Sequence, residues 1–177
     1  MRSPQLRLAC GLYLLLGCRS SSFCFGYGTK LPAGEDLIRG RVVISRGGQP
    51  VVWEGGAFSR EGMQVYVMPQ AGGTPERYIL RGDGSFCWHF RPGRYVIAGI
   101  EGQAGMRFSS GRIWAEFSVP ASASQTCVGT LAIQFSGDRY TLNVVDDCDA
   151  IQAAKSGSYP TGTGAWRKEL MVLEAFK

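Results

Sequence analysis

Histidine and long apolar runs are scarce in this chain of 177 residues. His89 is the only histidine and no Cys-x-x-Cys pair occurs, so the usual ligands of a zinc site are lacking. The longest apolar run, residues 8–17, is much shorter than the roughly 20 residues that cross a bilayer. Neither a Gly-x-Ser-x-Gly elbow nor a phosphate-binding loop is present. We therefore predict no catalytic residue, no metal, no cofactor and no transmembrane helix.

Charge of one sign is not concentrated anywhere in the sequence. Nineteen Lys and Arg residues stand against fourteen Asp and Glu residues, which gives a formal net charge of +5. The basic residues are scattered among acidic ones, without the run or helical stripe that typically marks a nucleic-acid interface. We expect a mixed, solvated surface and no nucleic-acid partner.

The N-terminus has the pattern of an export signal. Arg2 and Arg7 precede the apolar residues 8–17, and the segment closes with Leu15-Leu16-Gly17-Cys18. This ending resembles the lipobox of bacterial lipoproteins. The resemblance implies that residues 1–17 are a signal peptide and that Cys18 carries acyl chains such as palmitate. It also implies a lipid anchor in the cell envelope, in the outer membrane facing the periplasm or the cell surface. Residues 18–37, rich in Ser, Gly and Pro, are expected to be the tether.

Cysteine numbers fit an exported protein. Once Cys10 leaves with the signal and Cys18 is acylated, an even set of four cysteines remains for an oxidising compartment. One pair follows from a hairpin, because Gly137-Asp138 is a two-residue turn signal between alternating segments. Counting outward from that turn places Cys127 opposite Cys148, at a site where Cα atoms lie about 4.5 Å apart. We predict this disulfide, and Cys24 with Cys87 by elimination.

The same count fixes the hairpin register and the face of each residue. It pairs Phe135 with Tyr140, Ile133 with Leu142 and Leu131 with Val144. Further alternating segments, separated by Gly and Pro, are expected at residues 38–45, 63–69, 76–81, 85–91, 94–100 and 112–119. Turn signals at this spacing predict a mainly β protein, an antiparallel β-sandwich.

Helix is expected only near the C-terminus. Residues 148–156 fit a short helix, and residues 166–176 have apolar residues at helical spacing, although residues 170–173 also fit an edge strand. The expected organisation is a β-sandwich domain over residues 38–120. Residues 121–177 would add a β-hairpin and short helices that pack on it.

Three segments resemble a known family. They are Gly40-Arg-Val-Val, Gln64-Val-Tyr-Val, and the run from Asp83-Gly84 through Phe86, Trp88 and Phe90 to Pro92-Gly93-Arg-Tyr. Together they resemble the carboxypeptidase regulatory-like, or transthyretin-like, β-sandwich. The resemblance implies a non-catalytic accessory module. Its enzymatic relative, 5-hydroxyisourate hydrolase, uses several histidines and a C-terminal Tyr-Arg-Gly-Ser motif, both lacking here.

Candidate binding residues are few. Alternation places Trp88 in the core and His89 on the opposite face, beside Cys87, so His89 is expected to be partly exposed and non-catalytic. Trp114 lies on the polar side of its strand and is the best candidate for contact with a glycan. We therefore favour a lipid-anchored structural or protein-interaction module that docks an envelope protein. A carbohydrate-binding lipoprotein is the alternative, and an enzyme with an unrecognised site is a third.

Overall fold

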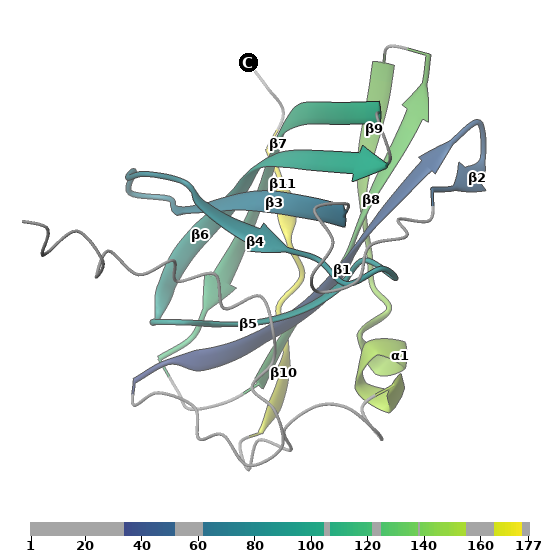
Figure 1. The fold of residues 1–177 in the computed structure, drawn as a ribbon. Helices are drawn as coiled ribbons and strands as arrows, with labels where there is room; N and C mark the ends of the chain where they lie inside the picture. The colour runs from purple at the N-terminus through teal and green to yellow at the C-terminus, as the bar shows by residue number, and fades with distance from the viewer. Residues whose placement is uncertain are drawn as a thin grey trace, which may run out of the picture.

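The structure is a computed structural model that describes residues 34–51, 62–104, 107–121, 125–137, 139–154 and 165–174. In these ranges the chain is mainly β, with two sheets that pack on a common core and one short helix, α1 (Cys148–Ala153). Figure 1 shows the purple β1 crossing the molecule beside the green β8, with the teal strands of the other sheet beyond them. No helix in the described ranges is long and apolar enough to cross a membrane.

The first sheet, sheet A, is built on two long neighbouring strands that run parallel. Its strands are β1 (Asp36–Arg46), β2 (Gln49–Pro50), β5 (Ser85–Phe90), β8 (Gln125–Ser136), β9 (Arg139–Val145) and β10 (Trp166–Lys168). β1 and β8 are the parallel pair, and β2 and β5 pair antiparallel with β1. β9 and β10 pair with β8. The strictly antiparallel arrangement expected from the sequence is therefore wrong for β1–β8 and β10–β8.

The second sheet, sheet B, is antiparallel throughout. Its order is β11-β7-β6-β3-β4, with β3 (Gly62–Pro69), β4 (Glu76–Ile79), β6 (Gly93–Ala104), β7 (Arg107–Val119) and β11 (Val172–Leu173). β4 is one edge of this sheet and β11 is the other. The Pro92-Gly93 turn joins β5 of sheet A to β6 of sheet B, so the sequence motif sits where the chain passes between sheets.

The core lies between the sheets and follows the alternation of the strands. Sheet A contributes Ile38, Val42 and Leu131, and sheet B contributes Val65 and Ile113, all fully buried. Trp88 is also fully buried, and its ring stacks on Phe86 with centroids 3.8 Å apart. The expected core face of β5 is therefore confirmed, since Phe86, Trp88 and Phe90 all belong to the buried cluster.

The hairpin of β8 and β9 has the predicted register. Leu131 pairs with Val144, Ile133 with Leu142, and Phe135 with Tyr140. The hairpin is not a layer added to a finished sandwich, however, because β8 is the direct neighbour of β1 inside sheet A. A two-residue turn specifies its own hairpin register, but it does not say which strand the hairpin will lie beside.

The C-terminal segment completes both sheets. Residues 166–168 and 172–173 are strands β10 and β11, so the edge-strand interpretation applies and the helical one for this segment is wrong. Between them, Glu169 N–H donates to the Cys127 carbonyl and Met171 N–H to the Val128 carbonyl. The segment thus follows β8 before it crosses to β7 of sheet B. Pairing with two sheets satisfies more backbone groups here than a short isolated helix would.

Candidate functional site at the open edges of the two sheets

The predicted disulfide between Cys127 and Cys148 is present, with Cα atoms 5.8 Å apart. It lies outside the ladder of β8 and β9, which ends at the pair Thr130 and Val145. The pairing of β8 with β1 shifts near Gly129, which has φ +77°, and Cys148 is the first residue of α1. The disulfide therefore ties the bulged start of β8 to the helix, rather than two strictly opposed strand residues.

The other predicted cysteine sites are described only in part. Cys18 and Cys24 lie outside the described residues. Cys87 is buried and disulfide-bonded. The bond to Cys24 and the acylation of Cys18 therefore stay predictions.

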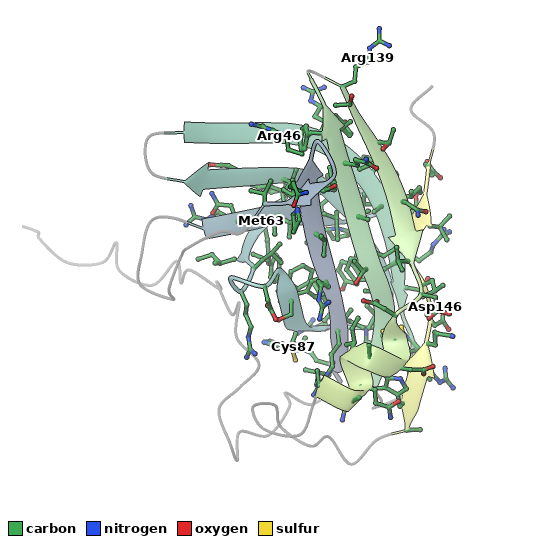
Figure 2. All side chains as sticks on the ribbon, turned by 90° about the vertical axis from the view of Figure 1, so that its right-hand side faces the viewer. Arg46, Met63, Cys87, Arg139 and Asp146 are labelled. Carbon is green, nitrogen blue, oxygen red and sulfur yellow. A yellow bond between two sulfur atoms is a disulfide. The ribbon has the colours of Figure 1, made fainter. Side chains whose placement is uncertain are left out.

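The segments that carry the more exposed large apolar side chains meet at one corner. Among the side chains that the structure describes, these are Val145, Leu170 and Val172, exposed by 41%, 36% and 62%. A Cβ on Gly129 would lie 2.7 Å from the Val145 carbonyl oxygen and 2.9 Å from Leu170 Cδ2. The start of β8, the end of β9 and the chain just before β11 therefore meet there. β11, which carries Val172, also contacts β9. We call these three side chains the β9–β11 corner. In Figure 2, Asp146, next to Val145, lies beside the yellow C-terminal strands.

The backbone of β9 offers hydrogen-bonding groups along its outer edge. No described strand pairs with that edge. In a hairpin closed by a two-residue turn, the residues flanking the turn form a hydrogen-bonded pair, and such pairs alternate with non-hydrogen-bonded ones. With Ser136 opposite Arg139, the N–H and C=O groups of Tyr140, Leu142 and Val144 therefore point outward. Their side chains are only half-buried against the core.

A polar cleft of about 280 Å³ lies on the opposite side of the sandwich, near β4 and β5, the outermost described strands on that side of their sheets. We call it the β4–β5 cleft. Its lining residues come from the start of β1 and from the ends of β3, β4, β5 and β6: Glu35, Val67, Met68, Pro69, Glu76, Tyr78, His89, Phe90, Arg91 and Tyr95. Two carboxylates, two phenols and one imidazole converge there on a partly apolar wall.

The polar side chains of the cleft are linked in pairs. Tyr78 Oη donates to Glu76 Oε2 at 3.1 Å, and Tyr95 Oη donates to the Arg91 carbonyl oxygen at 3.0 Å. His89 Nδ1 bonds to Glu35 Oε2, and both side chains are mostly buried. Each phenolic hydrogen is therefore directed at an acceptor of the protein itself.

Burial and the neighbouring carboxylates keep the phenols protonated. Desolvation raises the pKa of Tyr78 far above its ordinary value, and the negative charges of Glu76 and Glu35 raise it further. Desolvation also raises the pKa of Tyr95, and Glu35 and Glu76 add to that effect while the Arg91 charge opposes it. Both carboxylates thus act electrostatically on both rings, as expected of groups that surround one small space.

The predicted glycan platform at Trp114 has its polar atoms engaged. Trp114 lies on the outer face of sheet B, as expected, and is half-buried. Its Nε1 donates to Glu116 at 3.1 Å, and the other Glu116 oxygen accepts from Gln70 at 2.7 Å and Arg94 at 2.9 Å. Burial raises the pKa of Glu116, but these donors and the Arg94 charge hold it below its ordinary value. These hydrogen bonds leave Trp114 and Glu116 little spare capacity for sugar hydroxyls.

Sequence reasoning found His89 but not the site around it. His89 was placed correctly on the face opposite Trp88, whereas Glu35, Glu76, Tyr78 and Tyr95 were not connected with it. Glu35 is separated from His89 by 54 positions in the sequence, so no local motif joins them. Their only shared signal is that each lies at a strand end. The ends of neighbouring strands meet at the rim of a two-sheet structure.

The described residues contain no group of three or more His, Cys, Asp or Glu side chains arranged to hold a metal ion. In the comparisons with known proteins, no protein-family model matches this chain. No curated protein matches it either.

Proposed function

We propose that this protein is a lipid-anchored cell-envelope module that docks an envelope protein at the β9–β11 corner and performs no catalysis. The observation that carries the proposal is that Val145, Leu170 and Val172 are the exposed large apolar side chains among those described, and that the segments carrying them adjoin one another. Exposed apolar groups gathered at one place typically mark a protein-interaction site. The Leu15-Leu16-Gly17-Cys18 sequence supports the anchor, and the two-sheet core supports the carboxypeptidase regulatory-like resemblance.

The partner is proposed to dock as an extended strand beside β9. A free edge offers outward N–H and C=O groups as a template for another chain. Here those groups belong to Tyr140, Leu142 and Val144, whose half-buried side chains a neighbouring strand would cover. The partner segment therefore needs apolar residues at alternate positions, placed over these side chains.

Site-specific photo-crosslinking in cells tests the docking. A photoreactive residue at Val172 or Val145 is expected to capture one envelope protein, whereas the same residue at the exposed Gln49 of β2 captures none. Leu170→Lys should abolish the adduct without lowering the thermal midpoint, because Leu170 is already exposed. Equal capture at Gln49, or an adduct that survives Leu170→Lys, would contradict docking at this corner.

Amide exchange tests the mode of docking. A synthetic peptide copying the crosslinked segment should slow hydrogen exchange at Tyr140, Leu142 and Val144 of the purified full-length protein. Slower exchange at Arg139, Thr141 and Asn143 alone would contradict strand addition, since their amides face β8.

The anchor is tested separately. Cys18→Ala should leave an unprocessed or soluble protein, measured by fractionation and by the mass of the N-terminal peptide. Normal processing and membrane retention of that variant would rule the anchor out.

A further inference from the structure

We propose that the β4–β5 cleft binds a primary alkylammonium group, a function separate from docking at the β9–β11 corner. The cleft lies beside β4 and β5, whereas the corner lies at the β9 and β11 edges. A ligand here would therefore leave the proposed docking edge accessible.

Hydrogen-bond capacity defines the ligand as a donor. Both phenolic hydrogens are directed at protein acceptors, since Tyr78 donates to Glu76 and Tyr95 donates to the Arg91 carbonyl. A phenolic oxygen accepts as well as donates, and an ionised carboxylate offers about four acceptor positions. The remaining capacity of Glu35, Glu76, Tyr78 and Tyr95 is consequently that of acceptors. An ammonium group, with three donors and no acceptor, is complementary to such a cleft.

Charge favours a cation over a neutral donor. Glu35 and Glu76 bring two negative charges to the lining, and both act on the two phenols, as the raised pKa values of Tyr78 and Tyr95 indicate. Among the lining residues Arg91 is the fixed cation; its side chain and that of Glu76 are both exposed, so water screens the repulsion from Arg91 and part of the attraction to Glu76. His89 is engaged with Glu35. Glu76 bonds to the neutral hydroxyl of Tyr78 and is the carboxylate best placed to receive a ligand's charge.

The wall of the cleft suits an alkyl stem. Val67, Met68, Pro69 and Phe90 line it beside the polar groups. Long amine side chains commonly bury their methylene groups on apolar surface while the charged end meets a carboxylate. A volume of about 280 Å³ is small, so one side chain or one short diamine is the expected occupant. Two sources share this chemistry, a lysine side chain of another protein and a free diamine.

Titration by NMR tests the proposal on the purified full-length, isotopically labelled protein. The probes are Nα-acetyl-lysine methylamide and 1,5-diaminopentane, with the Nε-acetylated lysine amide and a trimethylated lysine amide as controls. Both primary amines should cause saturable shifts of the Glu76, His89 and Tyr95 amides. The neutral probe should cause none, and the trimethylated one should bind at least about tenfold more weakly because it lacks donors. Tighter binding of the lysine amide would identify a protein source, and tighter binding of the diamine a small molecule.

Paired variants locate the site. Glu76→Gln should weaken primary-amine binding about tenfold or more, and Tyr78→Phe severalfold. Glu169→Gln removes the same charge from an exposed position on the segment between β10 and β11 and should leave affinity unchanged. Circular dichroism confirms that each variant is folded before titration. The proposal is overturned if neither amine produces saturable shifts, if the acetylated probe binds as well as the amine, or if Glu169→Gln weakens binding as much as Glu76→Gln.

Discussion

The two sides of this molecule close the gap between the sheets in different ways. On the β4–β5 side, a short turn joins the edge strands, and aromatic rings pack behind them: Tyr78 lies 5.0 Å from Trp88 and 5.4 Å from Phe90, centroid to centroid. On the β9–β11 side, the edges belong to segments that are separate in the sequence. A disulfide and the crossing of residues 169–171 hold that side together.

The two sides differ in how far apart in the sequence the residues that form them lie. The first side is encoded locally, by one run from β4 through β5 to β6, and its remaining surface is a polar cleft. The second side depends on contacts between distant residues, and its remaining surface carries exposed valine and leucine. Locally encoded closure places its apolar groups inside, whereas the second side leaves apolar side chains exposed beside its edge strands.

A pair of glycines gives the largest expected difference between the sides. Gly84 immediately precedes β5 and has φ +77°, and a Cβ there would lie 1.9 Å from the Val42 carbonyl oxygen. Left-handed strain together with a backbone clash should make Gly84→Ala cost about 5 kcal/mol. Gly129 has the same φ but milder contacts, so Gly129→Ala should cost about 3 kcal/mol. Urea unfolding measures both, and a larger loss for Gly129→Ala would reverse the ranking of the sides.

Neighbouring residues on β5 test which face carries the stability. Trp88→Ala should lower the free energy of unfolding by about 4 kcal/mol, because the ring is fully buried and stacked on Phe86. His89→Ala should cost only about 1 kcal/mol, since its partner Glu35 lies at the rim of the cleft. Thermal melts of the two variants compare the faces directly. If His89→Ala unfolded the protein while Trp88→Ala left its thermal midpoint unchanged, the core face and the outer face of β5 would be the reverse of those described.

The disulfide should matter more at its own corner than across the molecule. Replacing Cys127 and Cys148 together with serine should cost about 3 kcal/mol, by loop entropy for a separation of 21 residues. Hydrogen exchange should accelerate first in α1 and at the start of β8, while β5 stays protected. Uniform acceleration in both sheets would mean that the two sides unfold as a single unit.

Alkaline pH should weaken the β4–β5 side selectively, with the smallest effect of the four. Burial raises the pKa of Tyr78 above the value of about 10 expected in the unfolded chain. The unfolded state therefore loses its proton first as the pH rises, and stability falls above about pH 10. In the Tyr78→Phe variant, the thermal midpoint should fall less between pH 9 and pH 11 than it does in the parent protein. An unchanged slope would show that Tyr78 does not control this dependence.

Prediction from sequence succeeded where residues close together in the chain decide the structure, as when a turn pairs the two strands that flank it. The turn at Gly137-Asp138 was enough to derive the register of β8 and β9, and alternation was enough to bury Trp88. The predicted Cys127–Cys148 bond is present, but it lies beyond the paired part of the hairpin. Prediction failed for the parallel pairing of β1 with β8 and for the strand at residues 166–168, and it left residues 170–173 open between a helix and an edge strand. Parallel neighbours have no connecting turn between them, so periodicity alone does not reveal which strands meet.

By itself the sequence determined that the fold is mainly β, which residues of β5 face the core, and the register of one hairpin. Each of these depends on residues close together in the chain. The tertiary structure alone decided that β8 enters sheet A beside β1 and that the C-terminal segment closes both sheets. It also decided that Glu35 and Glu76 meet Tyr78, His89 and Tyr95 in one cleft. Both candidate sites lie at strand edges and ends. Which edges and ends become neighbours is settled only when the two sheets pack on their common core.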